Sequence, residues 1–299
     1  MKYIIGVDGG GTKTEAVAYS LDGNKLGEGK SGYGNLLINE KQAITNIIEA
    51  IDLCKTGIQN GSCLYICLGL AGFGGVENPE GIKRALTEAF DTPFTIVNDA
   101  MIAHAALLKG KDGILTISGT GAVSIGTHNG TEEFAGGWGH ILGDEGSGYW
   151  IAMQAFINMT KEEDEGLNYS QLTTAMLTKL GYHSAVELKK FIYSATKAEV
   201  AAFVPIIVEQ ADAGDEFSKN ILIQAGYHLS KNALDVCKKL NVGNDVTIAI
   251  KGSILTHIPM VQSSFINHLK LEKPDVKLIV DEVSSTLGCY YMALKHTRE

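Results

Sequence analysis

Short apolar runs alternate with turn residues and amphipathic stretches along the first part of the chain. The apolar runs predict strands at residues 4–8, 15–19, 25–29, 64–68 and 94–97. Apolar residues at helical spacing predict helices at residues 40–56, 80–90 and 99–109. A hairpin is expected at residues 21–24, where Asp-Gly supplies the positive φ angles that such turns need. This order of elements is typical of an α/β lobe.

The same pattern begins again at residue 113. Strands are predicted at residues 113–117, 122–126 and near Phe134, with a glycine turn at 118–121 and an Asn-Gly turn at 128–130. The order strand, Gly/Thr-rich turn, strand, Asx-Gly turn, strand therefore occurs twice. This repeat favours two like lobes, and a chance similarity between hairpins is the alternative.

The predicted lobes are residues 1–112 and 113–284, and no linker rich in Ser, Pro or Gly separates them. Residues 147–239 are predicted to be mostly helical and would form an insertion in the second lobe. Strands at 246–250 and 277–280 follow. A closing helix over 285–294, within a last segment of about 285–299, could pack back on the first lobe.

Composition excludes several classes of protein. With 45% hydrophobic and 20% charged residues, the chain resembles an ordinary globular protein, and no apolar run approaches the roughly 20 residues needed to span a bilayer. We expect no signal peptide, no membrane partner and a cytoplasmic location. The net charge of -9 disfavours nucleic acid as a partner. The five scattered cysteines suit a reducing compartment; Cys63 and Cys67 are interpreted as structural thiols, with metal or redox use as the alternative.

The first candidate site is the run Asp-Gly-Gly-Gly-Thr-Lys-Thr at residues 8–14. Its glycines let backbone N–H groups approach phosphate oxygens, and Thr12 and Thr14 would add hydroxyl donors. Asp8, at the end of a buried strand, suits a hydrated Mg²⁺ carried by a nucleotide. A plain glycine-rich hairpin is the alternative. A weaker glycine match at residues 27–32 is discounted, because the strand-like run 36–38 follows it where a helix should open.

Four other runs carry candidate chemistry. The turn Ser-Gly-Thr-Gly at 118–121 could bind phosphate as the first run does. Asn98-Asp99 follows a predicted strand, so that Asp99 is either a helix N-cap or a general base. The glycine-rich run 136–150 could bind a sugar, and its His140 is interpreted as structural or hydrogen-bonding, with metal binding as the alternative. Residues 250–254 form a strand-to-helix turn that could seat an adenine or be an ordinary loop.

Together these runs resemble the BadF/BadG/BcrA/BcrD-type ATPase family, which groups N-acetylglucosamine kinases with ATPase subunits of benzoyl-CoA reductase and 2-hydroxyacyl-CoA dehydratase activators. The run 136–150 is similar to the loop of the sugar kinase branch. The resemblance implies an α/β protein of two ribonuclease-H-like, actin-like ATPase lobes. Each lobe would have a mixed five-stranded sheet flanked by helices, and the active site would lie in the cleft between the lobes.

The resemblance also implies roles for individual residues. Asp99 would be the catalytic base for the sugar 6-hydroxyl, and Asp8 would face Mg²⁺ through water. ATP would be held by Asp8, Gly10, Gly11, Thr12, Lys13, Thr14, Gly119, Thr120, Gly121, Gly252 and Ser253. The sugar would be held by Asn35, Asn98, Asp99, Gly136, Gly137, Trp138 and Asp144.

The predicted activity is ATP-dependent phosphorylation of an amino sugar at its 6-hydroxyl, with N-acetylglucosamine or N-acetylmuramic acid as substrate. Glucosamine and glucose are alternative substrates. An ATP-driven activator of a partner enzyme and a sugar sensor without turnover are alternative functions. Lys251 stands where many relatives have glycine, and residues 283–288 lack the usual proline and Gly-Ala pair, which bears on nucleotide preference. The family resemblance also makes a homodimer plausible.

Overall fold

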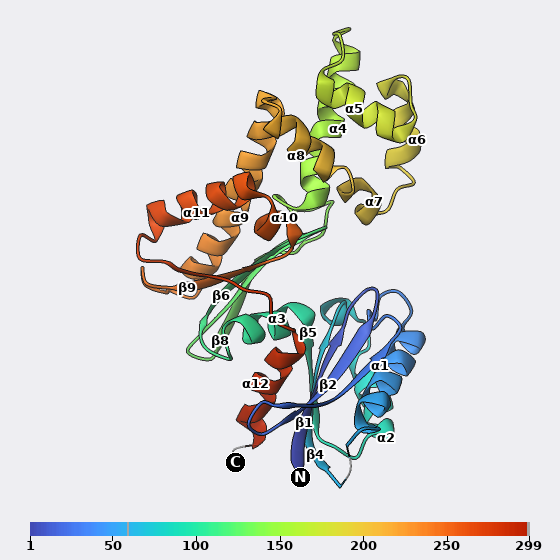
Figure 1. Ribbon diagram of the computed structural model, residues 1–299, viewed down its shortest axis with the longest axis vertical. Helices are drawn as coiled ribbons and strands as arrows, with labels where there is room; N and C mark the ends of the chain where they lie inside the picture. The colour runs from blue at the N-terminus through green and yellow to red at the C-terminus, as the bar shows by residue number, and fades with distance from the viewer. Residues whose placement is uncertain (59, 298–299) are drawn as a thin grey trace. The chain divides into compact units, whose positions relative to one another are not determined.

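The computed structural model describes residues 1–58 and 60–297, which form two compact units (Figure 1). Unit 1 combines the described parts of residues 1–111 and 282–299, and unit 2 contains residues 112–281. Both ends of the chain therefore belong to unit 1. No helix in the described part of the chain is long and apolar enough to cross a membrane.

Unit 1 is built on a mixed five-stranded sheet with the strand order β3-β2-β1-β4-β5. Its strands are β1 (Lys2–Gly9), β2 (Thr14–Ser20), β3 (Lys25–Ser31), β4 (Ser62–Leu70) and β5 (Phe94–Asn98). The first three strands are antiparallel neighbours, whereas β4 runs parallel to β1 and β5 parallel to β4. The β2–β3 hairpin turns at Gly23, whose φ is 84°. The strands and this hairpin confirm the elements predicted for the first part of the chain.

Helices cover both faces of this sheet. One face packs on α1 (Glu40–Lys55) and α2 (Pro79–Ala89), with Ile47 and Ile51 of α1 fully buried. The other face packs on α12 (Thr286–Thr297), which contacts α3 (Asp99–Leu107), β1 and β4 although it comes from the end of the chain (Figure 1). A Cβ at Gly288 of α12 would lie 1.8 Å from the carbonyl oxygen of Ile102 in α3. Only glycine permits this helix crossing.

Unit 2 repeats the same sheet. Its strands are β6 (Gly113–Ser118), β7 (Ala122–His128), β8 (Thr131–Gly136), β9 (Thr247–Lys251) and β10 (Lys277–Val280), in the order β10-β9-β6-β7-β8. The directions also match, because β6, β7 and β8 are antiparallel neighbours while β9 and β10 run parallel to β6. The repeat of sheet order and direction confirms the two mixed five-stranded sheets expected from the sequence.

The helices of unit 2 lie mainly between β8 and β9, as predicted. They are α4 (Gly148–Asp164), α5 (Gln171–Leu180), α6 (Leu188–Ile192), α7 (Lys197–Ala201), α8 (Val204–Asp212), α9 (Glu216–Lys239), α10 (Ser253–His257) and α11 (Pro259–Glu272). Short 3₁₀ turns occur at Phe73–Gly75 in unit 1 and Ala185–Glu187 here. The long helix α9 packs on β6, β7 and β8, and α11 packs on α9 (Figure 1).

One local expectation was wrong, and the structure excludes one of two alternatives. Residues 36–38 form a turn and not a strand: Leu36 is buried, while Leu37 and Ile38 are exposed. The N-cap of α3 is Asn98, whose side chain accepts the N–H of Ala100, so that Asp99 is the first residue of the helix and not its cap.

Candidate active site

The glycine run after β1 folds into a tight turn. The N–H of Gly10 donates to the carbonyl of Lys13 at 3.0 Å, which closes the turn. The carbonyl of Gly10 accepts the N–H groups of Gly34 at 2.9 Å and Asn35 at 3.1 Å. The turn is therefore fixed against the segment that follows β3, and this contact places Asn35 beside the glycine run.

A cavity of about 350 Å³ opens beside this turn, lined by Asp8, Gly10, Gly11, Thr12, Lys13 and Glu15. A Cβ added at Gly11 would meet no atom within 4 Å, and its φ is not in the left-handed region. Neither packing nor backbone conformation therefore requires glycine at this position. The position leaves room for a ligand to approach the backbone closely, on the side where the cavity opens.

Thr14 lies differently from the expected hydroxyl donor. Its side chain is fully buried in β2, and its hydroxyl would lie 2.7 Å from a Cβ at Gly34. The residue packs beneath the segment after β3 and does not line the cavity. Thr12 is therefore the threonine of this run whose side chain borders the cavity.

The predicted base lies at the same edge of the sheet as the glycine turn. The parallel register aligns Gly9 with Leu70 and Leu70 with Asn98, so these residues form one row across β1, β4 and β5. Asp8 precedes that row by one residue, and Asp99 follows it by one. The fold of unit 1 thus brings both predicted carboxylates to the carboxyl-terminal edge of one sheet.

A glycine-rich loop after β4 completes this edge, and it was not among the predicted sites. Ala71 donates its N–H to the carbonyl of Gly9 at 2.9 Å and accepts the N–H of Leu36 at 3.2 Å. Gly72 has a φ of 80°, and a Cβ there would lie 2.7 Å from Oδ1 of Asn35. The available signal was the run Ala-Gly-Phe-Gly-Gly at 71–75 directly after a buried strand, which is the same pattern as at 8–14.

Unit 2 carries the second glycine turn, between β6 and β7. The N–H of Gly119 donates to the carbonyl of Gly121 at 3.0 Å, and the carbonyl of Gly119 accepts the N–H of Gly148 at 2.7 Å. The carbonyl of Thr120 accepts the N–H of Tyr149 at 3.4 Å. Gly119 resembles Gly11, because a Cβ there would meet nothing within 4 Å. Each glycine turn thus has one position, Gly11 or Gly119, where no other residue lies against the backbone.

The buried carboxylate of Asp144 connects this turn with the glycine-rich loop. Asp144 is 3% exposed and has a φ of 63°. Its Oδ1 lies 3.5 Å from the N–H of Ala122, and its Oδ2 would lie 3.0 Å from a Cβ at Gly121. The carbonyl of Ala122 in turn accepts the N–H of Gly137 at 2.9 Å. The residues predicted for phosphate and for sugar in this unit therefore form one connected structure.

The turn after β9 joins the same structure. Gly252 has a φ of 92°, and a Cβ there would lie 2.3 Å from the carbonyl oxygen of Ser118. Ser253 follows it as the first residue of α10. Gly252 is therefore held against the start of the 118–121 turn, so the three segments predicted to bind nucleotide or sugar in unit 2 are neighbours.

Two aromatic side chains of the loop differ in their surroundings. Trp138 is 64% exposed, and its ring lies 5.9 Å from that of Phe134. The ring of His140 packs edge-on against Tyr149 at 4.7 Å. This contact supports the structural interpretation of His140.

Residues 5–288 match the sequence profile of the BadF/BadG/BcrA/BcrD ATPase family. The chain belongs to this family. It is 32% identical to an N-acetylmuramic acid/N-acetylglucosamine kinase of Clostridium acetobutylicum over 98% of both chains. It is 33% identical to an N-acetyl-D-glucosamine kinase of Dictyostelium discoideum over 81% of both.

The fold is also that of a solved structure. A crystal structure from Chromobacterium violaceum superposes with a TM-score of 0.76 at 24% identity, covering 98% of this chain and 99% of that one. This likeness, together with the two sheets, confirms the expected ribonuclease-H-like fold. Because the chain is a member of the BadF/BadG/BcrA/BcrD ATPase family, its nucleotide is ATP.

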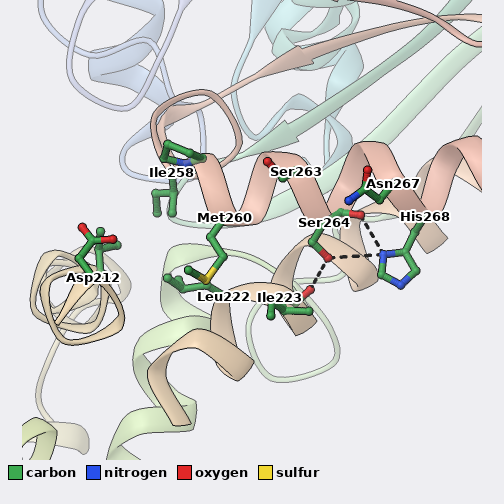
Figure 2. A pocket seen from close by; sticks show the side chains of 11 residues that line it. Asp212, Leu222, Ile223, Ile258, Met260, Ser263, Ser264, Asn267 and His268 are labelled. Carbon is green, nitrogen blue, oxygen red and sulfur yellow. Dashed lines mark hydrogen bonds between the residues drawn. The ribbon is translucent and has the colours of Figure 1, made fainter. Parts of the chain in front are cut away.

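A larger cavity, of about 580 Å³, lies apart from these residues between α8, α9 and α11 (Figure 2). Its lining is mainly apolar, and two of its polar groups are bound to backbone. The hydroxyl of Ser264 donates to the carbonyl of Ile223 at 2.7 Å, and Nδ1 of His268 lies 2.8 Å from the carbonyl of Ser264. None of the residues expected to bind ATP or sugar in this family lines the cavity, so it is not the candidate active site.

Proposed function

We propose that this chain is a sugar kinase that transfers the γ-phosphoryl group of ATP to the 6-hydroxyl of an N-acetylated hexosamine. N-acetylglucosamine and N-acetylmuramic acid are the proposed substrates. One observation carries the proposal: the identity to the Clostridium kinase extends over 98% of both chains. The relationship therefore includes both glycine turns, the 136–150 loop and Asp99, and not only a shared ATPase core.

In the proposed reaction Asp99 is the general base. As the 6-oxygen of the sugar forms its bond to the γ-phosphorus, the carboxylate of Asp99 takes the hydroxyl proton, the bond to the β–γ bridging oxygen breaks and ADP leaves. The proposed sugar-binding residues are Asn35, Asn98, Asp144 and the backbone of the Gly136-Gly137 pair.

The glycine turns would hold the phosphates. Catalysis of phosphoryl transfer depends mainly on positioning and on neutralising the charge of the phosphate oxygens. The backbone beside Gly11 and Gly119 is open to such a ligand, because neither glycine has a neighbour where a side chain would begin. Thr12 and Lys13 line the unit 1 cavity and would add a hydroxyl and a positive charge.

We also propose that ATP is used with Mg²⁺. The residues of the cavity fit this ion, because Asp8 offers a hard carboxylate oxygen there and Mg²⁺ usually keeps several waters beside one or two protein carboxylates. Asp8 would hold the ion, through water. Bound with ATP, Mg²⁺ would neutralise part of the phosphate charge.

A cytoplasmic location is part of the proposal. All five cysteines are free thiols, and four of them are buried, which suits a reducing compartment. A homodimer stays a prediction from the family resemblance.

The test is ADP release from ATP and Mg²⁺ with a panel of N-acetylglucosamine, N-acetylmuramic acid, glucosamine and glucose. Wild type is compared with Asp99→Asn, which keeps an oxygen for the N–H of Ala100. We expect sugar-dependent turnover whose kcat falls about 10²–10⁴-fold in the variant, since a general base contributes that much. Asp91→Asn, an exposed carboxylate of the same unit, is the control and should be unchanged.

Two results would contradict the proposal. Folded protein that binds ATP but releases no ADP with any sugar would favour the activator or the sensor. Iron in the purified protein would then favour the activator. Full turnover by Asp99→Asn would remove Asp99 from the role of base.

A further inference from the structure

The glycines of the loop after β4 do not all have a structural reason. Position 72 requires glycine, because φ is 80° there and a Cβ would collide with Oδ1 of Asn35 at 2.7 Å. Gly74 and Gly75 have no positive φ. A Cβ at Gly75 would touch Leu37 at 3.5 Å, which is an ordinary contact. The nearest atom to a Cβ at Gly74 is Nδ2 of Asn98, 4.0 Å away.

Open space at a glycine does not by itself indicate a ligand. Gly57, on the surface beyond the end of α1, also has no neighbour within 4 Å. What distinguishes Gly74 is the amide beside it. Oδ1 of Asn98 accepts the N–H of Ala100, which orients the NH₂ group of the same side chain as a donor next to Gly74. The amide NH₂ group recognises an acceptor oxygen.

An apolar side chain lies on the other side of the loop. Leu37 is 63% exposed, and its side chain lies 2.7 Å from the position of a Cβ at Gly72 and 3.5 Å from that of a Cβ at Gly75. The turn at 36–38 presents this leucine outward although Leu36, next to it, is buried. The loop therefore combines a hydrogen-bond donor next to Gly74, an apolar side chain next to Gly72 and Gly75, and backbone without a side chain.

These three properties match a group that has a carbonyl oxygen and a methyl group side by side. We propose that Gly74 is a specificity-determining residue, which keeps open a recess for the acylamino group of the hexosamine. The acyl oxygen accepts from Nδ2 of Asn98, and the acyl carbon chain faces Leu37. A hydroxyl group would use the donor alone and would need neither the leucine nor the missing Cβ. The inference rests on the proposed kinase function.

The test measures kcat/KM with glucosamine carrying N-formyl, N-acetyl and N-propionyl groups, for wild type, Gly74→Ala and Gly74→Val. The ratio of N-formyl to N-acetyl efficiency is the readout. We expect Gly74→Val to raise this ratio about tenfold, because one methylene or methyl in a filled pocket changes discrimination by about that factor. Gly74→Ala should raise it less, and KM for ATP should stay unchanged in both variants. Gly75→Ala is the matched control, with a ratio equal to that of wild type.

The outcomes separate this inference from the function on which it rests. Wild type that phosphorylates none of the three sugars would contradict the kinase proposal itself. Active wild type with a ratio unchanged in both Gly74 variants would overturn the inference alone. An equal loss on all three sugars would also overturn it, because it would indicate a general disturbance of the loop. Circular dichroism and thermal melting check that each variant is folded. If Gly74→Val does not fold, Gly74→Ala serves as the test.

Discussion

Asn98 and Asp99, at the end of β5 and the start of α3, have different roles. Asn98 caps α3 by accepting the N–H of Ala100 at 2.9 Å, and Asp99 is the first residue of the helix. The cap therefore does not depend on the charge of Asp99. A substitution that removes this charge and keeps an oxygen can be expected to change chemistry without melting the helix, which is why Asp99→Asn is an informative variant.

The burial of the cysteine thiols leads to a second prediction at the scale of residues. Burial raises the pKa of Cys54 and of Cys237 to about 11, and burial raises that of Cys289 as well. At pH 8 a thiol with such a pKa is a thiolate in only about one molecule in a thousand, and the thiolate is the reactive form. Burial raises the pKa of Cys63 as well, but Cys63 is the partly exposed cysteine and so the one that the reagent can reach. Titration with Ellman's reagent should therefore label about one thiol in native protein and all five in urea.

Fast labelling of several thiols in native protein would contradict this expectation. It would mean that helices α1, α9 or α12, which bury these side chains, open readily. Cys63→Ser is the control, and it should remove the fast phase without changing the number of thiols labelled in urea.

At the scale of elements, the crossing of α12 over α3 depends on one missing side chain. A Cβ at Gly288 would lie 1.8 Å from the carbonyl oxygen of Ile102 and 2.7 Å from the amide nitrogen of Ala106. These are backbone atoms of a helix, so the two helices would have to move apart.

Gly288→Ala should accordingly lower the free energy of unfolding by about 1–3 kcal/mol, the usual cost of overpacking. Urea denaturation measures the change. Gly57→Ala is the matched control, because a Cβ there meets nothing and φ is not positive. It should change stability by less than about 0.5 kcal/mol. Equal stability of Gly288→Ala and wild type would show that α12 can shift on α3 without loss.

Elements whose signals are local were predictable from the sequence. The hairpins follow from Asp22-Gly23 and Asn129-Gly130, which carry their own turn chemistry. The turn at 36–38 was mistaken for a strand, because Leu-Leu-Ile has strand propensity but finds no neighbouring strand to pair with. The role of Gly72 could not be predicted, since its collision partner is Asn35, a residue distant in the chain. The position of the Thr14 hydroxyl beneath Gly34 could not be predicted either, because these two residues are also distant in the chain.

At the scale of the whole molecule, the two units differ in how the chain builds them. Unit 2 is one continuous stretch, residues 112–281, whereas unit 1 needs both ends of the chain. The final helix covers a face of the unit 1 sheet that includes Ile4, Val17 and Cys67.

Removal of residues 282–299 should therefore unfold unit 1. The deletion exposes an apolar face. The free energy lost with the burial of this face is comparable with the total stability of a domain, about 5–15 kcal/mol. We expect the shortened chain to aggregate or to show a reduced unfolding enthalpy in calorimetry, while the fragment 112–281 folds alone and unfolds cooperatively. A shortened chain with the full unfolding enthalpy would contradict the dependence of unit 1 on α12.

The return of the chain to unit 1 has a consequence during biosynthesis. A ribosome makes the strands of unit 1 first, but the helix that covers one face of their sheet follows the whole of unit 2 in the chain. Unit 2 can complete its core while the chain is still being elongated, whereas unit 1 must wait until α12 has been made. The nascent chain therefore carries an uncovered apolar sheet face while unit 2 is being synthesised, and a chaperone that binds nascent chains would find its binding site in the first lobe.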